Sequence, residues 1–193
     1  MPSGCDEIQQ NIHNTFGDQQ LVLIDDKFKS TTKHHINLLL FDDILAAART
    51  NNTTFLQQYI TDDVTHIDIN QCSKGPNDKG KTILTLATEN GHDVFIAALY
   101  QLFGDKIDVN KCDDSGYTPL LSAARSGHAD CITTLHTYFG NNINCIVVND
   151  MNNNALMLAV EHGHIDCITV LYNIFGNKLD INAVNIHGET ALI

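Results

Sequence analysis

The sequence predicts an all-α solenoid, a row of stacked helix-turn-helix units, from two observations. The dipeptide Gly-His begins at residues 91, 127 and 163, and Phe-Gly begins at residues 103, 139 and 175, so both recur every 36 residues. Within each unit the apolar residues after Gly-His, such as Ile96, Leu99 and Phe103, follow the spacing i, i+3, i+7. That spacing places them on one face of a helix.

Each unit is expected to contain two helices and a projecting turn. A short helix is predicted over residues 82–90 and a longer one over residues 92–103, with the same pair 36 and 72 residues further on. Gly104 follows the longer helix, and glycine ends a helix at little cost because it tolerates a positive φ. Residues 107–110 then alternate apolar and polar side chains and lead into a turn at residues 113–116.

The repeat period divides the chain into six expected segments. The first segment is expected to be a cap, because an end unit needs cover for its apolar face. The last segment is the start of a fifth unit. The segments are residues 1–40 (cap), 41–80 (a degenerate repeat 1), 81–116 (repeat 2), 117–152 (repeat 3), 153–188 (repeat 4) and 189–193 (the start of a truncated repeat 5). Because the last segment stops inside the motif, we expect the sequence to be part of a longer protein.

Residues 118–128 contain the most specific motif, Thr-Pro-Leu-Leu-Ser-Ala-Ala-Arg-Ser-Gly-His. This segment resembles the Thr-Pro-Leu-His-x-Ala-Ala-x-x-Gly-His motif of the ankyrin repeat, with Leu121 in place of the usual His. The resemblance covers roughly residues 41–193. The period of 36 exceeds the family's ~33, and the extra residues amount to about one helical turn, which we expect to lengthen the second helix.

Charge and composition exclude several classes of function. The chain has 11 Lys and Arg residues against 23 Asp and Glu, a net charge of −12, which argues against a nucleic-acid partner. Its apolar runs are too short to cross a membrane, and its N-terminus shows no secretory signal. Six cysteines without a short-spaced pair are interpreted as free thiols, so a cytoplasmic location is expected.

One segment matches the phosphate-binding loop letter for letter. Residues 75–82 fit G-x-x-x-x-G-K-[ST], which in nucleotide-binding proteins lies between a buried strand and a helix. Here Gly80 and Thr82 recur one unit later as Gly116 and Thr118, and no strand–helix–strand pattern surrounds them. We therefore interpret the match as a repeat turn, and we expect neither a nucleotide cofactor nor a small-molecule substrate.

The histidines and cysteines also resemble a metal site. His162, His164 and Cys167 have ligand-like spacing. However, His164 belongs to the repeated Gly-His positions, and Cys167 shares its place in the repeat with Cys131 and Phe95, a helix-core position. We therefore expect no metal site and no catalytic residue.

The resemblance to ankyrin proteins implies a protein partner, bound by the turn tips and by the exposed face of each first helix. The tip of the last turn is expected at residues 186–189. Tyr117, Arg125 and Met151 are expected near the centre, because such side chains are enriched there. The expected partner-binding residues are Lys79, Leu86, Glu89, Asp114, Ser115, Tyr117, Ser122, Arg125, Asp150, Met151, Leu158, Glu161 and His162.

Two functions fit this resemblance. The first is a non-enzymatic protein-interaction module. The alternative is the targeting arm of a larger enzyme or secreted effector whose catalytic domain lies beyond Ile193. If the chain is a delivered bacterial effector, its location would be the host-cell cytosol.

Overall fold

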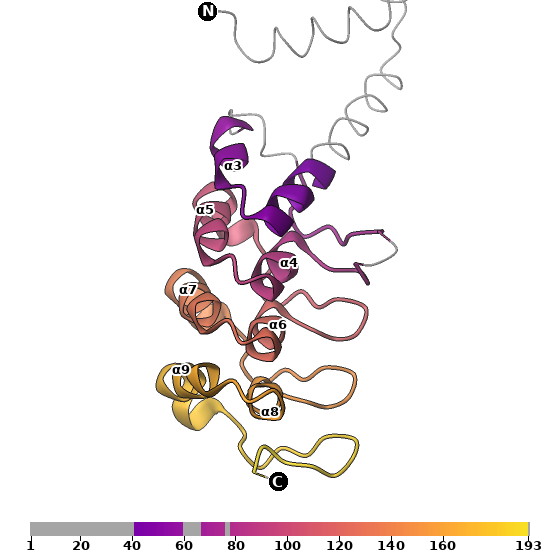
Figure 1. Ribbon diagram of the computed structural model, residues 1–193, viewed down its shortest axis with the longest axis vertical. Helices are drawn as coiled ribbons and strands as arrows, with labels where there is room; N and C mark the ends of the chain where they lie inside the picture. The colour runs from indigo at the N-terminus through magenta and orange to yellow at the C-terminus, as the bar shows by residue number, and fades with distance from the viewer. Residues whose placement is uncertain (1–40, 60–66, 76–77, 193) are drawn as a thin grey trace, which may run out of the picture. The chain divides into compact units, whose positions relative to one another are not determined.

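The computed structural model describes residues 41–59, 67–75 and 78–192. The capping role expected of residues 1–40 lies outside the described residues. Within residues 41–192, helix pairs are stacked one after another, and a loop projects from the same side of each successive pair (Figure 1).

The described residues form helices, turns and loops, with no strand among them, so the expected all-α fold is confirmed. Residues 41–50 are helical and are followed by α3 (Thr53–Tyr59). The three complete pairs are α4 (Ile83–Glu89) with α5 (Asp93–Phe103), α6 (Pro119–Ser126) with α7 (Ala129–Phe139), and α8 (Ala155–Glu161) with α9 (Ile165–Phe175). These bounds agree with the sequence-based ones to within about two residues, which is the ordinary uncertainty of a helix end.

The start of each first helix is fixed by a capping side chain. Thr82, Thr118 and Asn154 are extended residues whose side-chain oxygens accept a hydrogen bond from the backbone N–H three residues later. Such a cap satisfies one of the free N–H groups at a helix start and stabilises a helix by about 1 kcal/mol. Asn154 therefore caps its helix in the same way as threonine does in the other two repeats.

The extra residues of the long repeat do not lengthen the second helix, so that expectation is wrong. α5, α7 and α9 each end at a glycine with a φ of 50°, 50° and 45°, respectively. A separate single turn of 3-10 helix follows each of them: η2 (Gly104–Lys106), η3 (Gly140–Asn142) and η4 (Gly176–Lys178). The left-handed glycine interrupts the α-helical hydrogen bonding, so the added turn is a different kind of helix.

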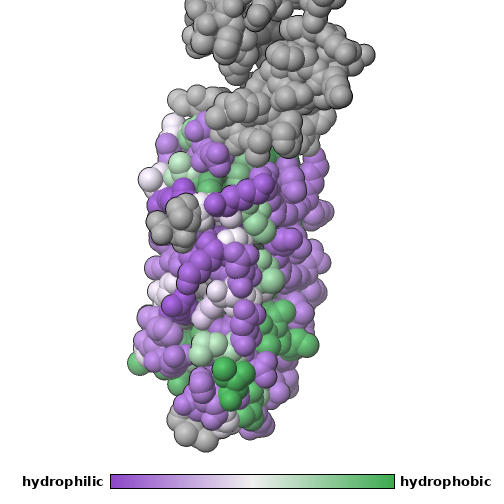
Figure 2. Space-filling model, turned by 90° about the vertical axis from the view of Figure 1, so that its right-hand side faces the viewer, coloured by the Kyte–Doolittle hydropathy of each residue, from purple (hydrophilic) through white to green (hydrophobic). Residues whose placement is uncertain are grey.

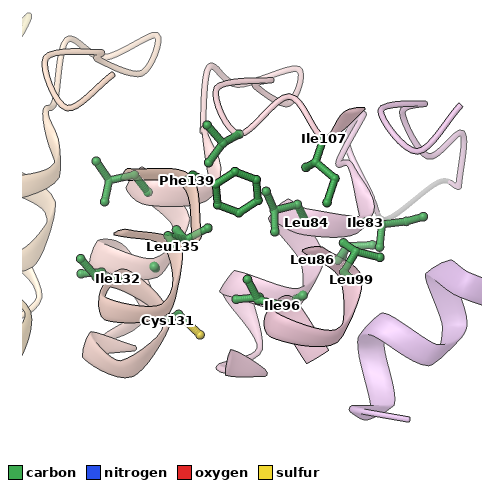
Figure 3. Packing of buried hydrophobic residues seen from close by; sticks show 14 of the residues in the cluster. Ile83, Leu84, Leu86, Ile96, Leu99, Ile107, Cys131, Ile132, Leu135 and Phe139 are labelled. Carbon is green, nitrogen blue, oxygen red and sulfur yellow. The ribbon is translucent and has the colours of Figure 1, made fainter. Parts of the chain in front are cut away.

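The hydrophobic core runs continuously through the stack. Phe95, Ile96 and Leu99 of α5 are fully buried, and Ile132 and Leu135 of α7 hold the equivalent places one repeat later. Figure 3 shows Ile96 and Leu99 in one cluster with side chains of α4 and α7. Each helix pair therefore completes the core of its neighbours, as expected for a solenoid.

Candidate partner-binding surface

One acceptor side chain organises each of the last three projecting loops. The Oδ1 atom of Asp113 accepts hydrogen bonds of 2.9 Å from the backbone N–H groups of both Ser115 and Tyr117. Asn149 and Asn185 do the same in the next two loops, at distances of 2.9–3.0 Å. A loop whose donors are satisfied in this way has a defined shape, so its tip presents side chains in fixed positions.

Neighbouring loops are joined by backbone hydrogen bonds. One N–H group in each loop donates to a carbonyl oxygen in the preceding loop. These bonds join Asp114 N to Lys79 O at 2.9 Å, Asp150 N to Ser115 O at 3.2 Å, and Ile186 N to Met151 O at 3.1 Å. The loop tips therefore form one continuous surface that repeats every 36 residues.

The structure corrects part of the expected binding face. Leu86, Ser122 and Leu158 were expected on an exposed face of the first helices, but their exposed fractions are only 4%, 5% and 1%. The first helices lie between their neighbours in the stack and against the second helices, and Leu86 lies within the core cluster in Figure 3. A partner cannot reach these three side chains.

Only the last residues of the first helices remain accessible beside the loops. Arg125, Glu161 and His162 are exposed, and Glu89 is half-buried. Glu89 is also engaged, because its Oε2 atom lies 2.5 Å from Nζ of Lys81. The accessible surface is therefore made of loop tips and helix ends rather than of a helix face.

Tyr117 and Arg125 are in contact with each other. The guanidinium carbon of Arg125 lies over the Tyr117 ring, 5.1 Å from its centroid, which is a cation–π contact. Tyr117 is half-buried and packs against the core, whereas Arg125 is exposed. Tyr117 therefore contributes to the core as well as to the surface, while Arg125 belongs to the surface alone.

Lys79, Ser115, Asp114, Asp150 and Met151 lie at the loop tips as expected. Ser115 is half-buried, and the other four are exposed. The exposed fraction of Met151 is 43%, a large value for an apolar side chain. These five residues therefore lie in the loops where they were expected, and their role in binding stays a prediction.

Sequence reasoning did not identify the apolar character of the last two loops. Val148, Val184 and Ile186 are exposed beside Met151, with exposed fractions of 40%, 50% and 61%. In Figure 2, which faces the loops, hydrophobic residues gather in the lower half of the view, over the C-terminal part of the stack. The sequence did contain a signal, because Val148 and Val184 are one period apart at the place that Cys112 holds in the loop before.

In the segment that matches a phosphate-binding loop, the described residues 75 and 78–82 make contacts within the protein. The Asp78 carboxylate accepts hydrogen bonds from Ser73 Oγ and from the Arg49 guanidinium. Partial burial raises the pKa of Asp78, but these two hydrogen bonds and the charge of Arg49 outweigh burial and hold the pKa below its usual value. Lys81 is paired with Glu89, and Thr82 caps α4. A carboxylate inside the loop and a lysine already paired do not favour a phosphate group.

The repeated histidines and cysteines have structural roles. His92, His128 and His164 each hydrogen-bond to a backbone carbonyl oxygen of the preceding repeat, at 2.7–3.1 Å. Burial raises the pKa of the Cys131 thiol to about 12 and that of Cys167 to about 11, so both thiols stay protonated at neutral pH.

Within residues 41–59, 67–75 and 78–192, no group of three or more His, Cys, Asp or Glu residues is arranged to hold a metal ion. None of the helices described there is long and apolar enough to span a bilayer.

Stacked helix pairs with hydrogen-bonded projecting loops define a solenoid repeat protein. The family model for ankyrin repeats in three copies matches residues 44–147, and the model for a single ankyrin repeat matches residues 151–186. The chain belongs to the ankyrin repeat family. A search of curated proteins finds no match to it. Ankyrin repeats are generally protein–protein interaction modules and are typically non-catalytic.

Proposed function

We propose that this chain binds a partner protein on its tip surface, which comprises the loop tips and helix ends of repeats 2 to 4 together with Lys79 at the tip of the loop before them. This surface consists of the expected residues that the structure leaves accessible. They are Lys79, Glu89, Asp114, Ser115, Tyr117, Arg125, Asp150, Met151, Glu161 and His162.

The repeat itself supplies the observation that supports this proposal. Equivalent positions in successive loops have the same backbone hydrogen bonds and meet the same structural demands. Lys79 and Ser115 hold the place that Met151 holds one or two loops later, so the loop does not need a large apolar side chain there. An exposed methionine that the fold does not require is readily explained by contact with another protein.

Arg125 and Tyr117 suit the centre of such an interface. Arginine and tyrosine are among the residues that contribute most binding energy in protein interfaces. Their mutual contact holds the Arg125 side chain in one place before binding, which reduces the entropy lost on association. We place the centre of the interface at Arg125 and Met151, with the Tyr117 ring in contact with the Arg125 guanidinium.

The free cysteines support a cytoplasmic location for the protein. The five cysteines among the described residues are all free thiols: Cys72, Cys112, Cys131, Cys145 and Cys167. Free thiols persist in a reducing compartment.

The proposal is tested by affinity capture from a eukaryotic lysate with quantitative mass spectrometry. The double variant Arg125→Glu, Met151→Asp changes the tip surface, and Thr133→Glu on the exposed side of α7 is a control for an added negative charge outside that surface. Proteins captured by the unchanged chain should be lost with the double variant and kept with the control. Capture of the same proteins by all three forms would contradict the proposal.

A further inference from the structure

The last two loops differ from the earlier ones in the chemistry of their tips. Two consecutive tip positions read Asp78-Lys79, Asp114-Ser115, Asp150-Met151 and Ile186-His187 in successive loops. In the last two loops, one of these two tip positions is therefore occupied by a large apolar residue, Met151 or Ile186. Because the hydrogen bonds between loops are the same throughout, this change does not arise from the fold.

Four exposed apolar side chains lie at or next to the tips of these two loops. The apolar patch consists of Val148, Met151, Val184 and Ile186. Its halves are held together by the Ile186 N–H group, which donates to Met151 O, and by Asn185 Nδ2, which donates to Asn153 Oδ1 at 3.0 Å. Neighbouring loops follow the stacking of the helices, about 10 Å apart, so an extended segment of about four residues can span both.

The surroundings of the apolar patch are acidic. Asp114, Asp150 and Glu161 are exposed, and none of the three has an ion-pair partner in the described part of the chain. Glu189 is also exposed, and it accepts a hydrogen bond from Asn185 Nδ2 at 2.8 Å. Of the basic residues of the tip surface, Arg125 lies on Tyr117 and Lys79 lies two loops away from Met151.

We propose that the segment bound here is cationic and amphipathic, with apolar side chains seated on the apolar patch and Lys or Arg side chains facing Asp114, Asp150, Glu161 and Glu189. This inference rests on the proposed function and specifies the partner's chemistry. Apolar contact supplies affinity, while the unpaired carboxylates attract a cationic segment and repel an acidic one. The chain's net charge of −12 acts in the same direction at longer range.

The test measures fluorescence anisotropy with three short labelled peptides. The first alternates Leu and Lys, the second replaces Lys by Glu, and the third replaces Leu by Ser. The Leu–Lys peptide should bind the unchanged protein about tenfold or more tighter than either of the others. Binding of the Leu–Glu peptide with equal affinity would overturn the assignment of charge.

Two pairs of protein variants separate the apolar patch from general attraction to an acidic protein. Met151→Ser with Ile186→Ser, and Asp150→Asn with Glu161→Gln, should each weaken the Leu–Lys peptide about tenfold, and the second pair should also reduce its salt dependence. Asp105→Asn with Asp166→Asn makes the same change of charge at exposed positions outside the tip surface and should leave the affinity unchanged. Equal weakening by this control pair would overturn the proposal.

Two further outcomes would also overturn the cationic partner. If the protein self-associates in sedimentation and Met151→Ser with Ile186→Ser abolishes this, the apolar patch binds a second copy of the chain and the proposal is wrong. If the peptides do not bind while lysate proteins are still lost with the Arg125→Glu, Met151→Asp variant, the proposed function stands and only the cationic partner is overturned.

Discussion

The Nε2–H group of His164 donates a hydrogen bond to the carbonyl oxygen of Arg125, one repeat earlier, at 3.0 Å. The same imidazole packs over Gly127, where a Cβ atom would lie 2.7 Å from the ring. His128 makes the same two contacts with Glu89 and Gly91. The Gly-His dipeptide is therefore a contact between adjacent repeats, which explains its period.

Gly127→Ala is expected to lower the free energy of unfolding by more than Gly163→Ala. The two glycines have φ values of 81° and 72°, so an alanine at either position costs about 1–2 kcal/mol. At Gly127 the new methyl group also meets the His164 ring, whereas nothing lies within 4 Å of a Cβ atom at Gly163. Urea unfolding measures both losses, and equal values would show that the imidazole does not restrict this position.

Asp113→Ala is expected to destabilise the protein by about 1–3 kcal/mol, because two N–H groups lose their acceptor. Asp113→Asn should cost much less, since the asparagines Asn149 and Asn185 do the same work in the next loops. Thermal unfolding of the two variants checks this expectation. Losses of equal size would mean that the carboxylate charge, rather than the acceptor oxygen, holds the loop.

Ile146→Asn is expected to stabilise the protein by about 0.5–1.5 kcal/mol. Asn110 joins two repeats, because its Nδ2 donates to Asn142 O at 2.7 Å and its Oδ1 accepts from Asn144 N at 2.8 Å. Ile146 holds the same place one repeat later with an exposed fraction of 65%, so this bridge is missing there. A variant less stable than the unchanged protein in urea unfolding would contradict this view, and Asn110→Ile should show the opposite effect.

ATP and GTP with magnesium are expected to bind no better than about millimolar despite the match at residues 75–82. Lys81 is paired with Glu89, and the Asp78 carboxylate is held in the same loop. Isothermal titration calorimetry measures the affinity directly. Micromolar binding that disappears in Lys81→Ala would show that the loop does hold phosphate.

The fold could be predicted because the marks of the repeat are local. Thr118 caps a helix and Gly127 ends it, and both roles can be inferred from residues within one repeat, although Gly127 also contacts His164 of the next repeat. The added 3-10 turn was missed because the repeat spacing gives only the length of an insertion. It does not give the φ of 50° at Gly104, which ends the α-helix before the added turn begins.

The binding surface was only partly predictable, because the position of a residue in the repeat does not say how deeply its side chain is buried. Ser122 and Arg125 are three residues apart in α6, yet the first is 5% exposed and the second lies at the surface. Their difference depends on how neighbouring helices and loops cover α6. Val148 and Val184 were missed because valine is usual in a core, and their exposure follows from a loop geometry that the sequence does not show.

Hydroxyl-radical footprinting of the chain with its captured partner would show which side chains the partner covers, because methionine and tyrosine side chains react readily with the radical. Met151 is 43% exposed on the tip surface, and Tyr172 is 67% exposed on α9, so the chain contains its own internal control. We expect the partner to protect Met151 strongly and Tyr117 partly, and to leave Tyr172 unchanged. Protection of Tyr172 with full reactivity at Met151 would contradict the account and place the partner on the end of the stack.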